Sequence, residues 1–285
     1  MVEENVGEKV LILTCHHKND EFISVSRDFF CPVHAGTAVS NEVMGISGDN
    51  TGENISEKNK YFSELTVLFW AWKNTNSPFV GLMHYRRILS QRRDLVCEFR
   101  NFAGHILQLI KNTVCFRGAP FMKSNFYKVP SAKHARQLSR EFRGYIEKEI
   151  DNFDVFVPRK EVLYGLTVRE HYIHCHNEQD LEIFERILFD KYPDLASSYH
   201  EVMNGNQMYT CNMFIARRSI FNDYCAKLFD ILFEMEPIIV LSDRSDYQKR
   251  IFGFISERFL NVYLHSLSRR GARVREVSAV FIEDS

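Results

Sequence analysis

Four short apolar runs, each ending at polar or turn-forming residues, constrain this fold more than any other feature of the sequence. They span Lys9–Cys15, Phe79–Met83, Phe153–Val157 and Cys211–Ala216. The first run leads straight into two histidines, and the second leads into His84 and Tyr85. Buried parallel strands that deliver their carboxyl ends to a site have this pattern.

Amphipathic stretches separate these runs and predict helices. Phe62, Leu65, Phe69 and Trp72 recur with helical spacing, and the helix should end near Asn74. Asn177–Asp180 resembles a capping box that opens a helix over about 178–192. Further helices are expected over about 221–233 and 247–267, with a last strand at 274–282. Strands that alternate with helices predict an α/β fold of Rossmann-like type, with a mostly parallel sheet covered by helices on both faces. Ligands of such sheets bind at the carboxyl ends of strands.

Bulk properties exclude several classes of protein. The formal net charge of −1 argues against nucleic-acid binding, so we expect no nucleic-acid partner. The acidic, polar start MVEENVGEKV does not resemble a secretion signal, and no apolar stretch is long enough for a transmembrane helix. The seven cysteines are odd in number and never spaced CxxC, which is typical of free thiols in a reducing compartment. A cytoplasmic location is therefore expected.

Residues 91–150 interrupt the alternation. They lack a clear strand pattern and hold twelve Lys or Arg against five acids. We expect a single domain over 1–285 with 91–150 as a basic, mainly helical insertion. The plainer interpretation is a solvated insertion with one packed face. The other is docking to an anionic membrane surface or lipid-phosphate acceptor, which would make the protein peripheral on the inner membrane face.

The loop at 45–60, GISGDNTGENISEKNK, precedes the first amphipathic helix. Ser56 is a plausible N-cap, and a helix N-terminus offers free N–H groups to an anion or polar ligand. An ordinary capped loop would have the same composition.

Two arginines, Arg86 and Arg87, follow the second apolar run. Adjacent arginines after a buried strand are costly unless they face solvent or an anion, and the arginine fork suits phosphate oxygens. The alternative is an ion-pair patch on the surface.

Two further clusters carry titratable groups. His171, His174 and His176, with Cys175 between the last two, resemble metal ligands, but no second ligand pair has zinc-like spacing. The structural interpretation is therefore favoured, with His176 free to face a cleft. Polar residues and one glycine recur in the last helix and could line a cleft or an exposed face: Arg250, Gly253, Glu257 and Asn261. Asp243 and Asp246 could bind a metal or form a turn and helix cap.

Several long segments together resemble a known family. GDNTGENISEKNKYFSELTVLFWAWKN followed by FVGLMHYRR is similar to the motif of an uncharacterised-domain family found in bacterial capsule and exopolysaccharide gene clusters. MYTCNMFIARRSIFNDYC and YQKRIFGFISERFLNVYL resemble its C-terminal half. The resemblance covers about 8–90 and 150–267, and residues 91–150 are longer than this family predicts. The family is regarded as glycosyltransferases related to the GT-A fold, some linked to galactofuranose transfer.

The resemblance implies a set of donor-binding residues. A GT-A domain holds the nucleotide near its first strand, which implies contacts from Thr14, His17 and Lys18. The loop motif and strand ends add the rest of the expected donor site: Asp49, Asn50, Lys58, His84, Tyr85, Arg87 and Asn212. GT-A enzymes usually carry an Asp-x-Asp metal motif where this chain has residues 84–86. This departure leaves a Mg²⁺ or Mn²⁺ requirement open and predicts no metal at 84–86.

Glycosyl transfer needs the leaving diphosphate neutralised and the acceptor hydroxyl deprotonated. Arg86, with Arg87, is the candidate for the first task. Glu257, with His176 behind it, is the candidate for the second.

The expected substrates are a nucleotide sugar, with a UDP-sugar and UDP-galactofuranose as named candidates, and a glycan or lipid-linked acceptor in capsule, exopolysaccharide or lipopolysaccharide synthesis. Two other functions stay open. One is a sugar-phosphate (phosphoryl) transferase of the same pathway, and the other is a non-catalytic nucleotide- or glycan-binding module.

Overall fold

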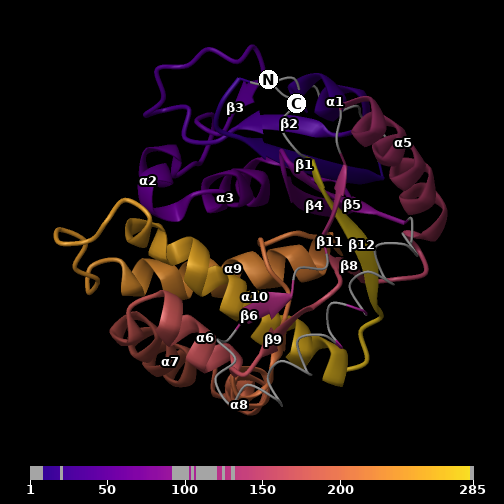
Figure 1. The fold of residues 1–285 in the computed structure, drawn as a ribbon. Helices are drawn as coiled ribbons and strands as arrows, with labels where there is room; N and C mark the ends of the chain where they lie inside the picture. The colour runs from indigo at the N-terminus through magenta and orange to yellow at the C-terminus, as the bar shows by residue number, and fades with distance from the viewer. Residues whose placement is uncertain are drawn as a thin grey trace.

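A nine-stranded mixed sheet forms the centre of the computed structural model, which describes residues 9–19, 22–91, 103, 106, 121–123, 126–129 and 132–282 (Figure 1). Its N-terminal half is parallel. The strands there are β1 (Val10–His16), β2 (Cys31–His34), β3 (Ser47–Gly48) and β4 (Phe79–His84). Strand β1 lies between β2 and β4, so the ends of three neighbouring strands reach the same edge.

The other half of the sheet is mixed. Its strands are β5 (Arg87–Ser90), β7 (Phe126–Val129), β8 (Val155–Pro158), β11 (Phe214–Arg217) and β12 (Val274–Ile282). Strand β11 runs antiparallel between β4 and β8, and β5 runs antiparallel to β12. The prediction of a mostly parallel sheet is therefore wrong for this half. An apolar run indicates that a strand is buried, but it carries no information about the direction of the strand.

A second, antiparallel sheet has three strands in the described part of the chain. They are β6 (Phe121–Lys123), β9 (Glu161–Tyr164) and β10 (Gln207–Met208), in the order β10-β9-β6. Two strands come from residues 91–150: β6 in this sheet and β7 in the large sheet. The expectation that this segment lacks strands is wrong at these two places.

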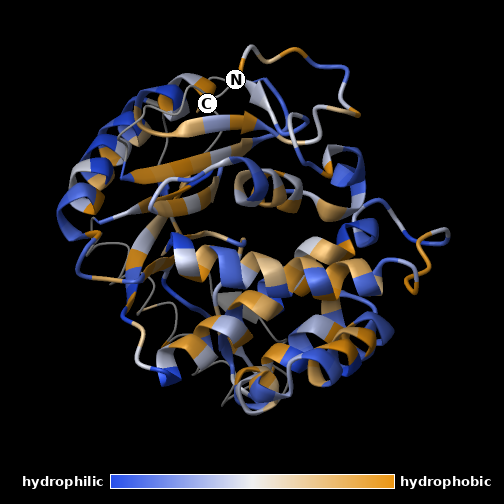
Figure 2. Cartoon of the chain, turned by 180° about the vertical axis from the view of Figure 1, so that it is seen from behind, coloured by the Kyte–Doolittle hydropathy of each residue, from blue (hydrophilic) through white to orange (hydrophobic). Residues whose placement is uncertain are grey.

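Helices cover both faces of the large sheet, as the alternating pattern predicts. One face carries α1 (Phe22–Phe29) and α5 (Ala132–Glu149). The other carries α2 (Asn59–Phe62), α3 (Leu65–Asn74), α9 (Arg218–Met235) and α10 (Ile251–Arg269). Outside these lie α6 (Val168–Cys175), α7 (Glu178–Lys191) and α8 (Ala196–Asn204). The strands are largely apolar and the outer helix faces polar (Figure 2).

Single-turn 3-10 helices lie at Ser56–Lys58, Pro193–Leu195 and Gln248–Arg250. None of the helices in the described part of the chain has the length and apolar character needed to span a bilayer.

Helix α5 is part of the core, although the sequence places it in the basic insertion. Leu138, Phe142 and Ile146 are fully buried in the cluster that also contains residues of β5. Its three arginines are engaged within the chain: Arg136 pairs with Asp28, Arg143 with Glu147, and Arg140 lies over the Phe29 ring. Most of residues 92–131 lie outside the described residues. Membrane docking by 91–150 stays a prediction.

Local capping only partly follows the sequence. Asn177 caps α7 as expected, since its side chain accepts a hydrogen bond from the Gln179 N–H. The reciprocal capping box belongs instead to Thr167 and Glu170 at the start of α6. Ser56 does not cap a helix, because its hydroxyl donates to Asp49.

Asp49 fixes the long loop between β2 and α3. Its carboxylate is fully buried and accepts hydrogen bonds from four donors: the backbone N–H groups of Gly36 and Thr37 and the hydroxyls of Ser56 and Thr66. A buried charge is tolerated only when its hydrogen-bonding capacity is filled in this way. The loop is further docked on α3 by the Trp70 Nε1–H, which donates to Thr51 Oγ1 at 2.9 Å.

We expect Asp49→Asn to lower the free energy of unfolding by about 3 kcal/mol. The amide would turn an NH₂ group toward groups that are themselves donors, and it would remove the charge that strengthens the remaining bonds. Urea unfolding followed by circular dichroism measures the loss. Glu57→Gln makes the same chemical change at an exposed position and should cost less than about 0.5 kcal/mol. Equal midpoints for the two variants would contradict the structural role of Asp49.

Candidate active site

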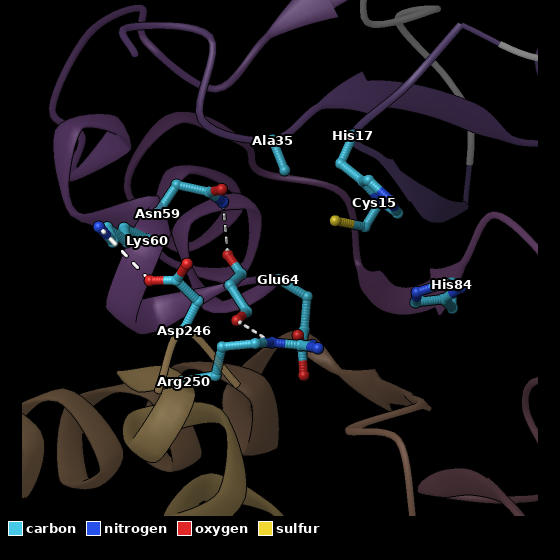
Figure 3. Close-up of a pocket in the computed structure, with 10 residues that line it drawn as sticks. Cys15, His17, Ala35, Asn59, Lys60, Glu64, His84, Asp246 and Arg250 are labelled. Carbon is cyan, nitrogen blue, oxygen red and sulfur yellow. Dashed lines mark hydrogen bonds and ion pairs between the residues drawn. The ribbon is translucent and has the colours of Figure 1, made fainter. Parts of the chain in front are cut away.

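The carboxyl ends of β1 and β4 open into a pocket of about 330 Å³, here called the β1–β4 pocket (Figure 3). Its walls come from the ends of β1, β2 and β4, from α2 and the residues after it, and from the segment that leads into α10. They are Cys15, His17, Ala35, Asn59, Lys60, Ser63, Glu64, His84, Asp246 and Arg250. The position is the one expected for a ligand of an α/β sheet.

Two predicted donor residues, His17 and His84, lie in this pocket. Burial, with the nearby Arg87 charge, lowers the pKa of His84 to about 3. Burial, with Lys18 nearby, also lowers the pKa of His17. Both imidazoles are therefore uncharged near neutral pH. They offer hydrogen bonds to a ligand and supply no positive charge.

The cations of the β1–β4 pocket are Lys60 and Arg250. The Arg250 Nε–H donates to the Ser63 hydroxyl at 3.0 Å, which anchors the guanidinium at one nitrogen. Lys60 lies 3.8 Å from Asp246, an exposed pair that leaves the ammonium largely in solvent. Arg250 is thus the anchored positive group of this pocket.

A second pocket, of about 360 Å³, lies farther along α10 and is called here the α6–α10 pocket. The two pockets adjoin, since Asp246 and Tyr247 are consecutive and Arg250 and Phe254 lie one helical turn apart. The α6–α10 pocket brings together three predicted site residues: Arg87, His176 and Glu257.

The Glu257 carboxylate is held from both sides. Its Oε1 accepts from the Cys211 N–H at 2.8 Å, and its Oε2 accepts from Arg258 Nη1 at 3.1 Å. Burial raises the pKa of the Glu257 carboxyl, although Arg258 and the Cys211 N–H favour its charged form. Such a shift brings a carboxylate closer to the range in which it can exchange a proton near neutral pH.

Arg258 is unusual because it is only 1% exposed while it lines a pocket. Its guanidinium contacts Glu257, donates to the Phe254 carbonyl and lies 2.9 Å from His171 Nδ1. It also lies over the Tyr172 ring, 5.0 Å from the centroid. Sequence patterns give no signal for this buried arginine.

His176 stacks on Phe254 with ring centroids 3.9 Å apart, and its Nδ1 lies 3.4 Å from Gln248 Oε1. Burial, with Arg258 nearby, lowers its pKa to about 4. Neither the His171–His176 cluster nor Asp243 and Asp246 forms a metal site: within the described ranges no group of three or more His, Cys, Asp or Glu side chains could hold an ion.

Backbone strain concentrates at the junction of the two pockets. Across the described residues, the non-glycine residues with positive φ are Ser63 (52°), Cys211 (70°) and Asn212 (49°). Ser63 lines the β1–β4 pocket and Cys211 lines the α6–α10 pocket. Asn212 connects them, because its amide donates to Glu64 Oε1 at 2.7 Å. Strained backbone persists where surrounding contacts enforce it, and it clusters at functional sites.

Several predicted donor residues lie elsewhere. Thr14 and Asp49 are fully buried within the protein, and Asn212 is 1% exposed. Lys58 forms an ion pair with Glu236 at 2.6 Å, and Asn50 is exposed on the loop. The structure thus gives Asp49, Lys58 and Asn212 contacts inside the chain, where the resemblance implied a donor.

The remaining predicted residues surround the β1–β4 pocket without lining it. Tyr85 is buried and packs edge-on against His17, with ring centroids 4.9 Å apart, and Lys18 lies over the Tyr85 ring. Arg86 donates from Nε to the Ile282 carbonyl at 3.2 Å and lies over the Phe281 ring, so it points toward β12.

The main residue that sequence reasoning missed is Glu64. It stands inside the quoted motif, between Ser63 and the apolar stripe of α3, and it lines the β1–β4 pocket. A signal was available, because a lone acidic residue interrupts the apolar run that begins at Phe62. Arg250 was correctly included among the polar residues of the last helix, without a role of its own.

Comparisons with known proteins agree with this geometry. The chain superposes on the solved apo structure of WbbM, described as a bifunctional glycosyltransferase, with a TM-score of 0.80 and 27% sequence identity. The match covers 97% of this chain and 46% of that chain, so this chain spans less than half the length of WbbM. No curated protein matches the chain.

A family model assigns the chain to a family. The model described as a domain of unknown function, DUF4422, matches residues 11–269, which include both pockets and every residue of their junction. The chain belongs to the DUF4422 family.

Proposed function

We propose that this protein is a glycosyltransferase that moves a sugar from a nucleotide-sugar donor to a hydroxyl group of a glycan or lipid-linked acceptor. The observation that carries the proposal is the close superposition on WbbM over nearly the whole chain, with a pocket at the carboxyl ends of the parallel strands. The fold alone does not define a reaction, so the chemistry of the two pockets must support it.

The two adjoining pockets suit two substrates. In this proposal the β1–β4 pocket takes the nucleotide sugar, and the α6–α10 pocket takes the acceptor. The bond between the anomeric carbon and the diphosphate oxygen breaks, and its electron pair leaves with the diphosphate. The acceptor oxygen bonds to the anomeric carbon, and its proton passes to Glu257.

The donor we propose is a UDP-sugar, with UDP-galactofuranose among the candidates, and the pathway is capsule, exopolysaccharide or lipopolysaccharide synthesis. These finer assignments come from the family resemblance of the sequence. A panel of UDP-glucose, UDP-galactose and UDP-galactofuranose, followed by release of UDP, tests the proposal.

The outcome of that assay separates three functions. Release of UDP from one donor supports glycosyl transfer. Release of UMP in its place, with the sugar phosphate carried to the acceptor, indicates phosphoryl transfer. Binding of UDP-sugars, seen as thermal stabilisation, without turnover on any acceptor indicates a non-catalytic binding module. A ligand at 100 times its dissociation constant stabilises by about 2.7 kcal/mol, which a thermal-shift measurement resolves.

Glu257→Gln should lower kcat by about 10² to 10⁴ and leave UDP binding unchanged, because the amide oxygen still accepts from the Cys211 N–H while the side chain loses its basicity. The wild-type rate should fall as pH drops through the Glu257 pKa, which burial places above the usual glutamate value of 4.5. Measurements of kcat/KM from pH 4 to 8 test this, since the variant should lose that acidic limb. An unchanged limb in Glu257→Gln would assign it to another group.

We further propose that the diphosphate is neutralised by arginine, without a metal at residues 84–86. Arg250→Ala should weaken UDP binding by roughly 10- to 150-fold, the equivalent of one charge-assisted hydrogen bond of about 1.5–3 kcal/mol. Arg250→Lys should recover only part of the loss, because a point charge cannot reproduce the fork. Calorimetric titration with UDP measures both.

Arg86→Ala is the matched comparison. Sequence reasoning predicts that it impairs donor binding, whereas its contacts with β12 favour a smaller effect than that of Arg250→Ala. Turnover after exhaustive chelation should persist. Loss of activity with chelator and recovery with Mg²⁺ or Mn²⁺, together with an unaffected Arg250→Ala, would refute arginine neutralisation.

A further inference from the structure

Glu64 stands at a break between two helices. Helix α2 ends at Phe62 and α3 begins at Leu65, and Ser63 between them has φ 52° and ψ −130°. Such a conformation costs a non-glycine residue about 1–3 kcal/mol. The break turns the chain so that Glu64 faces the β1–β4 pocket (Figure 3).

Hydrogen bonds to its N–H, its carbonyl and its hydroxyl enforce the conformation of Ser63. Its N–H donates to the Asn59 carbonyl at 2.8 Å, and its carbonyl accepts from Asn59 Nδ2 at 2.9 Å. Its hydroxyl accepts from Arg250 Nε at 3.0 Å. Because every polar group of Ser63 is used, the strain is fixed by contacts from both α2 and the start of α10.

A hydrogen bond to one oxygen orients the Glu64 carboxylate and leaves its other oxygen open to the pocket. Oε1 accepts from Asn212 Nδ2 at 2.7 Å, while Oε2 has no hydrogen-bond partner among the described residues. Asn212 is itself fixed, since Nδ2 also lies 3.2 Å from the Gly253 carbonyl and the residue is 1% exposed. A buried amide thus aims a half-buried carboxylate into a pocket.

The same strained turn holds two of the carboxylates, Glu64 in the β1–β4 pocket and Glu257 in the α6–α10 pocket. Cys211 presents its N–H to Glu257, and Asn212 presents its amide to Glu64. Both residues have positive φ, which a cysteine rarely adopts. The turn therefore fixes the relative positions of two acidic groups, one in each pocket.

We propose that Glu64 is a catalytic carboxylate that contacts the transferred sugar, and that Asn212 is the residue that positions it. The inference rests on the proposed glycosyl transfer. As the bond to the diphosphate breaks, positive charge develops at the anomeric carbon. A carboxylate that is already oriented stabilises this charge without reorganisation, and the effect is larger in a pocket shielded from water. Glu64 takes no proton in this step, because the acceptor proton passes to Glu257.

Glu64→Gln tests the assignment, with Glu57→Gln as the matched control in the same segment. We expect kcat of Glu64→Gln to fall at least about 10²-fold, as for the loss of other groups that stabilise transition-state charge. The dissociation constant of UDP, which lacks the sugar, should stay within twofold of the wild type. The control should match the wild type in both measurements.

Asn212→Gly tests the positioning role, because glycine accepts a positive φ and removes only the amide. We expect kcat to fall about tenfold with unchanged UDP binding. In the Glu64→Gln background the same substitution should cause no further loss, because residues that act through one interaction are not additive. A purely structural role for Asn212 would add its loss in full and would weaken UDP binding too.

Three outcomes overturn the proposal in distinguishable ways. If the wild type releases UDP and Glu64→Gln keeps kcat within twofold, Glu64 is not catalytic and the proposed function stands. If the double variant loses activity additively, the positioning role of Asn212 fails alone. If the wild type turns over no donor, the proposed function fails and the assignment falls with it. Should Glu64→Gln not fold, Glu64→Asp keeps the charge at shorter reach, and wild-type kcat for this variant would also exclude the role.

Discussion

The buried carboxylate of Asp49 is the interaction on which the N-terminal side of the cleft depends. It gathers two backbone N–H groups that follow β2 and two hydroxyls, one of them on α3. A charge without solvent must keep all of these donors, so the loop between β2 and α3 has little freedom. The loop in turn leads into α2 and the strained Ser63, and therefore fixes where Glu64 enters the pocket. Much of the polar sequence motif therefore stabilises the loop between β2 and α3.

The junction of the two pockets is held by a strained turn at Cys211 and Asn212. Cys211 and Asn212 adopt a conformation that L-residues disfavour, and the cost is offset by bonds to Glu257, Glu64 and the Gly253 carbonyl. These bonds connect the start of β11 with α10 and with the α2–α3 break. The antiparallel placement of β11 between β4 and β8 brings this turn to the cleft, which a parallel strand would not do. The mixed half of the sheet is thus part of the site's construction.

Few side chains carry charge in the two pockets, because burial keeps the histidines neutral. His84 and His176 both have a lowered pKa and remain neutral near pH 7. Fixed positive charge then comes from Arg250 in one pocket and from Arg87 and Arg258 in the other, facing Glu64 and Glu257. The proposed nucleotide sugar, which is anionic at one end and hydroxylated at the other, matches this arrangement of arginines, carboxylates and neutral imidazoles.

By itself, the sequence determined the α/β class, the main strands near 9–15, 79–83 and 274–282, and the helices on both faces. Apolar periodicity is a local property that burial imposes directly on the chain. It also identified His17, His84, His176 and Glu257 as residues of the cleft. Only the tertiary structure decided strand direction, the core position of α5 and the partners of Asp49. It also decided that Arg86 faces β12 while Glu64 and Arg258 face the pockets. These features depend on contacts between residues distant in sequence, such as Glu64 with Asn212, and periodicity carries no information about which distant partner a polar side chain meets.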